Sequence, residues 1–131
     1  MEGYLLDTHI WLWSVLEPER LESQIRELLA SEGSVLFLSS VSVWEAVLLG
    51  ERGRIVMKPD PITWSRETLA HSPIQEAPLN HEIAFRSRTL ETNLSDPADR
   101  FILATASVYN LTLLSMDKEI QKCKDVKIRA R

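Results

Sequence analysis

Short apolar runs alternate with helical segments along this chain, and this alternation constrains the fold more than any other feature. Residues 4–6, 35–38 and 111–115 form such runs, and each precedes a segment whose apolar residues recur every three or four positions. Strands of a parallel sheet have unbroken apolar runs because helices cover both faces of the sheet. The pattern predicts an α/β fold, a three-layer α/β/α sandwich with a mostly parallel central sheet of about five strands.

The other expected elements follow from start and stop residues. Helices are predicted over 8–15, from Pro18 to Gly33, and over 41–49, 62–70, 80–90, 98–108 and 118–122. Short strands are predicted within 74–79, at a sheet edge, and over 126–128. Ser39 and Asp96 are typical helix-start residues, whereas Gly50 and Gly53 are expected to end the helix before them.

Length and composition narrow the compartment and the chemistry. The 131 residues fit one domain, 1–131, and the single Cys123 excludes both an intrachain disulfide and a cysteine-based zinc site. No apolar run approaches the roughly 20 residues that span a bilayer, and the N-terminus lacks the basic segment of a signal peptide. We therefore expect a cytoplasmic protein, without a membrane partner, that uses oxygen and nitrogen groups for its chemistry.

The net charge of −4 argues weakly against a nucleic-acid partner, because phosphate binding is usually accompanied by a basic surface. Six of the fifteen basic residues nevertheless lie in the last 14 positions: Lys118, Lys122, Lys124, Lys127, Arg129 and Arg131. Two interpretations stay open for this group. It is either a solubilising tail or a patch that contacts phosphate groups.

Three acidic residues stand where strands end or helices begin. Asp7 directly follows the first strand, Asp117 lies just past the strand at 111–115, and Asp99 lies in the first turn of a helix. In a parallel sheet, ligands bind at the carboxyl ends of the strands, where the strand order reverses. Each acid also has a structural explanation, because an acid near a helix start caps the helix or suits its dipole. Only their position together at one edge of the predicted sheet indicates a functional site.

Glu45 is not explained by helix-start chemistry, since it lies in the middle of the helix over 41–49. At about 100° per residue, Val41 and Leu49 lie about 40° on either side, so the carboxylate is centred on an apolar arc. Burying an unpaired carboxylate is costly. Either Glu45 faces the one wet edge of the helix, paired with Arg52, or it is a buried acid that faces a cation.

Asp7, Glu45, Asp99 and Asp117 are therefore the candidate catalytic residues and metal ligands. Several carboxylates stay ionised in one pocket only if a positive charge lies among them. Hard oxygen ligands suit Mg²⁺ or Mn²⁺, and carboxylate-bound ions of this kind hydrolyse phosphodiesters. Asp96 is a fifth acid nearby, but its position before a proline is that of a helix cap.

Other catalytic signatures are absent from the sequence, which has no glycine-rich phosphate loop, no G-x-S-x-G elbow and no His-Glu-x-x-His. His9 is the only histidine near the acids in sequence. The tryptophans lie at helical positions among aliphatic residues, where core packing is the expected role, although one could line a partner groove: Trp11, Trp13, Trp44 and Trp64.

Four short sequence motifs occur in order along the chain. They are Leu5-Leu6-Asp7-Thr8-His9, Ser39-x-x-Ser42-Val43-Trp44-Glu45, Asp96-Pro97-Ala98-Asp99-Arg100-Phe101-Ile102-Leu103-Ala104 and Leu113-Leu114-Ser115-Met116-Asp117. Together they resemble the PIN-domain family, and most closely the VapC-type toxins of bacterial toxin–antitoxin pairs. The chain departs from that subfamily at the rim of the site, where Asn93-Leu94-Ser95 and Ala98 replace a histidine-rich lead and a phenylalanine.

The resemblance implies a Mg²⁺- or Mn²⁺-dependent endoribonuclease in which an activated water attacks the phosphorus and leaves a 5′-phosphate and a 3′-hydroxyl. It also implies an RNA substrate, a homodimer and a small antitoxin protein that blocks the site. The matching positions are three principal acids, a more variable fourth acid, and two hydroxyls that hold the acids or water in place: Asp7, Glu45 and Asp99; Asp117; Thr8 and Ser115.

Two other functions stay open at this point. A signalling module that binds Mg²⁺ and takes up phosphate on an aspartate would use a similar pocket, but the strand over 35–38 ends in Ser39-Ser40 rather than in the aspartate it needs. A PIN-like binding protein without catalytic activity is the second alternative, and the intact acids argue against it.

Overall fold

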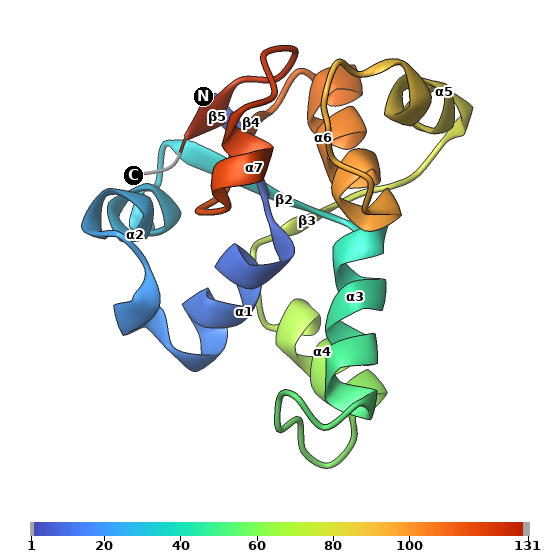
Figure 1. Ribbon diagram of the computed structural model, residues 1–131. Coiled ribbons are helices and arrows are strands. Elements are labelled where there is room, and N and C mark those ends of the chain that lie inside the picture. The colour runs from blue at the N-terminus through green and yellow to red at the C-terminus, as the bar shows by residue number, and fades with distance from the viewer. Residues whose placement is uncertain (1, 130–131) are drawn as a thin grey trace.

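A computed structural model describes residues 2–129 and contains one parallel sheet (Figure 1). Its strands are β1 (Glu2–Leu6), β2 (Ser34–Ser39), β3 (Gln75–Ala77), β4 (Thr112–Leu114) and β5 (Ile128–Arg129). They lie in the order β3-β2-β1-β4-β5, and every neighbouring pair is parallel. The predicted fold class is thus confirmed, and the short strand expected within 74–79 does form an edge.

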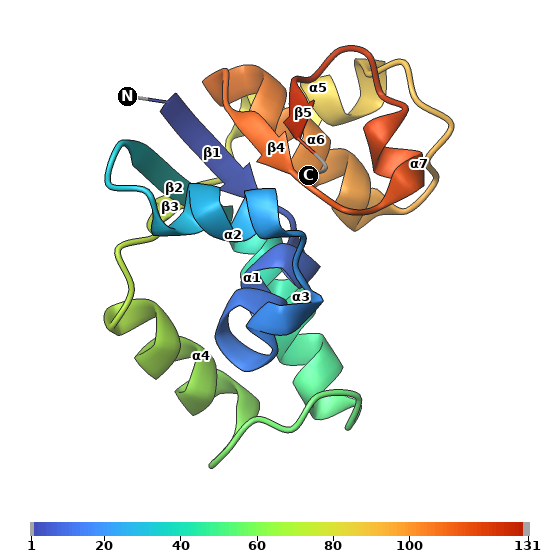
Figure 2. The same cartoon turned by 90° about the vertical axis from the view of Figure 1, so that its left-hand side faces the viewer.

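Helices cover both faces of the sheet. They are α1 (Thr8–Leu16), α2 (Ser23–Ala30), α3 (Ser40–Glu51), α4 (Pro61–Ala70), α5 (His81–Thr89), α6 (Pro97–Tyr109) and α7 (Lys118–Gln121). Figure 2 shows α1, α2 and α4 on one side of the strands and α5, α6 and α7 on the other. No helix within residues 2–129 is long and apolar enough to cross a membrane.

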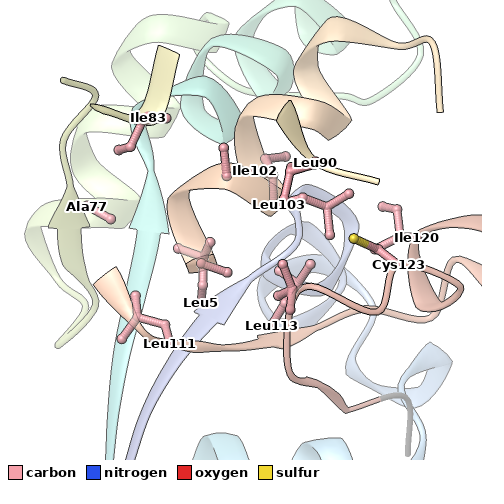
Figure 3. Close-up of a cluster of buried hydrophobic side chains, with 13 residues drawn as sticks. Leu5, Ala77, Ile83, Leu90, Ile102, Leu103, Leu111, Leu113, Ile120 and Cys123 are labelled. Atoms are coloured by element: carbon pink, nitrogen blue, oxygen red, sulfur yellow. The ribbon is translucent and has the colours of Figure 1, made fainter. Parts of the chain in front are cut away.

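Two hydrophobic clusters, one on each face of the sheet, form the core. Successive side chains of a strand point to opposite faces, so Leu5 joins one cluster while Tyr4 and Leu6 join the other. In the first cluster Leu5 packs with Ile102 and Leu103 of α6, as Figure 3 shows. The continuous apolar runs in the sequence are therefore explained by burial on both sides.

The single helix predicted from Pro18 to Gly33 is wrong. A short 3₁₀ helix over Pro18–Arg20 ends at Leu21, whose backbone is extended, and α2 then starts at Ser23. Both Leu21 and Ile25 are buried in the core cluster that α1 also joins. Their four-residue spacing imitates one helix, but Leu21 reaches the core from an extended segment.

α3 ends at Glu51, between the two glycines expected to stop it, and Gly50 is its next-to-last residue. A β-carbon at this position would lie 2.7 Å from Met57 Sδ and 2.9 Å from Pro61 Cγ. The glycine therefore permits the close approach of α3 to the start of α4. Gly53 follows the helix with φ of 72°, a conformation that suits glycine.

We predict that Gly50→Ala lowers the free energy of unfolding by about 1–3 kcal/mol, because the overpacking outweighs the gain of less than about 1 kcal/mol in helix propensity. Urea denaturation measures this change. Gly33→Ala is the matched control, since its β-carbon would meet only Ser31 Oγ at 3.7 Å. Equal stability of the two variants would contradict the packing explanation.

Candidate active site

The carboxyl ends of β1 and β4 lie side by side at the point where the strand order reverses. Leu6 pairs with Leu114, and the next residue, Asp7, donates its backbone N–H to the Leu114 carbonyl at 3.0 Å. From β1 the chain proceeds to β2 and β3 on one side, and β4 and β5 lie on the other. This reversal creates a crevice at the strand ends.

A hollow of about 400 Å³ occupies this crevice and contains all four predicted acids. It is lined by Asp7, Glu45, Asp96, Asp99, Asp117, His9, Ile10, Trp13 and Met116. The acids come from the start of α1, the middle of α3, the start of α6 and the start of α7. In Figure 1 the starts of α3 and α6 lie next to each other, which brings their acids together.

Asp7 is buried at the bottom of the hollow, with 7% of its surface exposed. Its Oδ1 accepts the backbone N–H of Thr8 at 2.8 Å, and its Oδ2 accepts the hydroxyl of Ser115 at 2.9 Å. Burial raises the pKa of Asp7, while these two hydrogen bonds and the nearby His9 oppose the rise. Both carboxylate oxygens therefore have fixed directions.

Ser115 connects two of the acids. While its hydroxyl donates to Asp7, its oxygen accepts the backbone N–H of Asp117 at 3.1 Å. Asp117 itself is exposed and caps α7 through Oδ1, which accepts the backbone N–H of Glu119 at 2.8 Å. Asp117 therefore serves as a helix cap and also lines the hollow.

The surroundings of Glu45 test the ion pair with Arg52 that one interpretation includes. Its half-buried carboxylate accepts the Thr8 hydroxyl at 2.5 Å, and Thr8 Oγ1 lies 3.0 Å from the buried Ser42 hydroxyl. No ion pair with Arg52 forms within residues 2–129. Burial raises the pKa of Glu45, the Thr8 bond opposes the rise, and the charge of Asp7 adds to it. The Thr8 hydroxyl is therefore a donor that neither interpretation included, and a cation facing Glu45 stays a prediction.

Asp96 and Asp99 divide the roles that their positions suggest. Asp96 Oδ1 caps α6 by accepting the backbone N–H groups of Ala98 at 2.8 Å and Asp99 at 3.3 Å, which confirms its predicted capping role. Burial, together with the charges of Asp96, Asp7, Glu45 and Asp117, raises the pKa of Asp99 to about 7. Without a cation, Asp99 is therefore about half protonated at neutral pH.

Arg100 has a positioning role that the sequence does not reveal. Its guanidinium donates to the carbonyls of Ser87 and Leu94, both at 2.8 Å, and to those of Leu90 and Thr92 at 3.4 Å. These bonds tie the segment before Asp96 to α6. An arginine without an acidic partner gives no sequence signal for such a role, because its partners are backbone carbonyls.

The donor set fits a hard divalent cation by its chemistry. Asp7, Glu45, Asp99 and Asp117 supply carboxylate oxygens, and the raised pKa values of the first three reflect burial and mutual repulsion that a cation would relieve. Within residues 2–129, no three acidic, histidine or cysteine side chains are placed to hold one ion together. Mg²⁺ usually keeps several waters and binds through one or two carboxylates, so it does not require three protein ligands.

The C-terminal basic residues lie outside the hollow. Lys118, Lys122, Lys124, Lys127 and Arg129 are exposed, and none of them lines it. Lys122 pairs with Glu119 at 3.0 Å, and Arg131 lies outside the described residues. The solubilising and phosphate-contacting interpretations both stay predictions.

We predict that the Asp99→Asn substitution raises the free energy of unfolding of the metal-free protein more at pH 8 than at pH 5. The expected difference is about 1–2 kcal/mol, a figure reduced for the partial exposure of the side chain. With its pKa near 7 when folded and near 4 when unfolded, Asp99 binds more protons in the folded state between these values. Its contribution is therefore complete below pH 4 and lost as the pH rises through 7. The asparagine of the variant does not titrate, so the variant does not lose this stability as the pH rises.

Urea denaturation at pH 5 and pH 8, without divalent ions, measures this difference between Asp99→Asn and wild type. Glu67→Gln, an exposed acid on α4 that does not line the hollow, is the control and should behave as wild type at both values. The same effect of Asp99→Asn at both pH values would contradict the shifted pKa.

Comparison with known proteins extends these observations. A PIN domain family model matches residues 4–126. Ribonuclease VapC22 from Mycobacterium tuberculosis is 26% identical over 122 residues, which are 92% of each chain. Among solved structures, VapBC2 from Rickettsia felis, bound to a promoter DNA fragment, has a TM-score of 0.74 at 17% identity and 97% coverage of each chain.

A second solved structure, VapC20 from Mycobacterium tuberculosis, is described as a sarcin–ricin loop cleaving toxin. It has a TM-score of 0.64 at 12% identity, with 95% of this chain and 98% of that chain covered. At such identities the structures show a shared fold, whereas the family model spans nearly the whole chain. The protein therefore belongs to the PIN domain family, as its four sequence motifs indicate.

Proposed function

We propose that this protein is a Mg²⁺- or Mn²⁺-dependent endoribonuclease, the VapC-type toxin of a toxin–antitoxin pair. The observation that carries the proposal is the convergence of Asp7, Glu45, Asp99 and Asp117 on one hollow at the strand-order reversal. The PIN domain match and the similarity to Ribonuclease VapC22 support it. RNA hydrolysis would leave a 5′-phosphate and a 3′-hydroxyl.

The four acids together would hold one or two divalent ions, and they differ in how firmly hydrogen bonds fix them. A bound divalent ion would supply the charge that activates a water and stabilises the leaving oxygen. Asp7 is the most rigid of the acids, because Ser115 and Thr8 fix both of its oxygens. Asp99 has a pKa near 7 without a cation, so it would release its proton as the positive charge arrives. Acidic conditions therefore oppose cation binding.

The two positioning hydroxyls would act through the acids. Thr8 donates to Glu45 through its hydroxyl and to Asp7 through its backbone N–H, so it fixes one acid from each of two elements. Ser115 links Asp7 to the backbone that carries Asp117. Outer groups of this kind orient ligands and tune the affinity for the metal.

We also propose an antitoxin partner, a homodimer and a cytoplasmic location. Several solved relatives of the same fold are toxin–antitoxin complexes, including one from Klebsiella pneumoniae with a TM-score of 0.67. An apolar groove beside the hollow shares Glu45 and Asp96 with it and carries Trp44, which is 59% exposed. A partner seated on this groove would lie at the mouth of the acid site.

The phospho-acceptor alternative is not favoured. The end of β2 carries Ser39, which is buried and caps α3 by accepting the backbone N–H of Val41 at 3.0 Å. A serine committed to a helix cap replaces the aspartate that such a module needs at this strand end. The catalytically inactive alternative becomes an outcome of the following test.

RNA cleavage by the purified protein tests the proposal directly. Cleavage is expected with Mg²⁺ or Mn²⁺ and not with EDTA, and Asp7→Asn or Asp99→Asn should reduce it on the order of 100-fold or more, as for other groups that stabilise transition-state charge. Glu67→Gln should cleave as wild type does. If the folded wild type binds Mn²⁺ but cuts no RNA, the protein is catalytically inactive and the proposal fails.

Ser115→Ala should lower Mn²⁺ affinity and RNA cleavage by about 10- to 100-fold, as the loss of an outer partner of a metal ligand does. Titration calorimetry with Mn²⁺ measures the affinity. Ser65→Ala is the matched control, because Ser65 is also buried but its hydroxyl has no hydrogen-bond partner within residues 2–129. Unchanged Mn²⁺ affinity in Ser115→Ala would show that the Ser115 hydroxyl does not position Asp7.

A further inference from the structure

The acid hollow has a second wall that carries aromatic rings. His9 and Trp13 line it together with Met116, and they lie four residues apart on α1, so they share one face of that helix. His9 is exposed and Trp13 is half-buried. Both rings are therefore accessible from the space that the carboxylates enclose.

The rings of His9 and Trp13 contact each other, and a cation contacts Trp13. Their centroids are 5.4 Å apart, with an angle of 51° between the planes. The guanidinium of Arg20 lies 4.3 Å from the centroid of Trp13, and Arg20 is itself held by Glu17 at 3.2 Å. Contacts of this cation–π kind contribute about 0.5–1 kcal/mol at exposed positions. The ring of Trp13 therefore contacts both the Arg20 guanidinium and the His9 ring.

Core packing accounts for only part of this arrangement. Trp11 is fully buried and packs against Trp64, with centroids 5.9 Å apart, and Trp13 packs partly against the same core cluster as Trp11. His9, in contrast, is exposed and lines the hollow from the same helix. An exposed imidazole next to an indole therefore lies at the edge of a proposed phosphate site.

We propose that His9 and Trp13 form a stacking platform for one unpaired nucleobase of the RNA substrate, next to the phosphate that the acid site binds. The inference rests on the proposed ribonuclease function. Five carboxylates line the hollow, so a phosphate enters only with a cation, whereas an uncharged base meets no such repulsion at the rings. A nucleotide carries both groups, and only a base outside a duplex can stack on a side chain.

The platform predicts a preference for single-stranded RNA with little dependence on base identity, because every base has a π-face. The two rings differ in role: His9 is the exposed surface that the base contacts, and Trp13 holds His9 in place. Replacing the His9 ring should therefore act on substrate binding without removing the carboxylates. The same change should leave Mn²⁺ binding intact.

The test compares cleavage of a short single-stranded oligoribonucleotide that spans a mapped cut site with versions that lack the base on one or other side of that site. Wild type should favour the intact oligonucleotide by about 5- to 100-fold in kcat/KM, the range for one stacked base. His9→Ala and Trp13→Leu should reduce this preference towards one, largely through KM. His9→Phe should keep the preference, and His9→Lys, which has a charge but no ring, should lose it.

Phe85→Ala is the matched control, since Phe85 is an exposed aromatic on α5 that does not line the hollow. An unchanged preference for the intact oligonucleotide in His9→Ala, which substitutes an exposed residue and should fold, would overturn the platform. Retention of the preference by His9→Lys but not by His9→Phe would also overturn it, in favour of a charge contact.

Tryptophan fluorescence keeps this inference separate from the proposed function. Quenching by the intact oligonucleotide that exceeds quenching by the abasic one, and that disappears in Trp13→Leu, supports the platform even if no RNA is cut. Cleavage by wild type without any such quenching refutes the platform and leaves the ribonuclease proposal standing.

Discussion

Burial of the Asp7 carboxylate at the end of the central strand is the constraint on which the site depends. A carboxylate so placed must find hydrogen-bond donors within the protein. Thr8 and Ser115 supply them, and Ser115 directly follows β4, the strand that pairs with β1 on the side where the order reverses. The register of β1 with β4 thus determines the orientation of Asp7. An error in that register would leave the charge without its partner.

Repulsion between carboxylates is concentrated in the acid hollow, and hydrogen bonds of some of the same acids offset part of it. Burial and the neighbouring acids together raise the pKa of Asp99 to about 7. Ionised Asp99 therefore destabilises the metal-free fold at the candidate site. Two helix caps compensate in part, because Asp96 and Asp117 each bind backbone N–H groups with one carboxylate oxygen. Arg100 holds the preceding segment through carbonyls alone, which fixes its position without neutralising the acids.

Sequence patterns predict the sheet, its layers and the identity of the acids, because burial on two faces and helix capping are local rules. They fail where contacts between elements decide. The extended backbone at Leu21 breaks the expected helix, and Gly50 permits the close approach of Met57 and Pro61. The Thr8–Glu45 hydrogen bond joins residues 37 positions apart, so neither interpretation of Glu45 included it. For the same reason the carbonyl partners of Arg100 could not be predicted.

The hydrogen bond between Ser115 and Asp7 spans 108 positions of the chain. During synthesis the first strand leaves the ribosome long before β4, so Asp7 waits for almost the entire chain before its second oxygen is satisfied. Asp99 and Asp117 also arrive late. A growing chain that lacks β4 and Asp117 therefore carries no complete acid hollow. The order of the acids along the chain thus delays the hollow until residue 117 has been made.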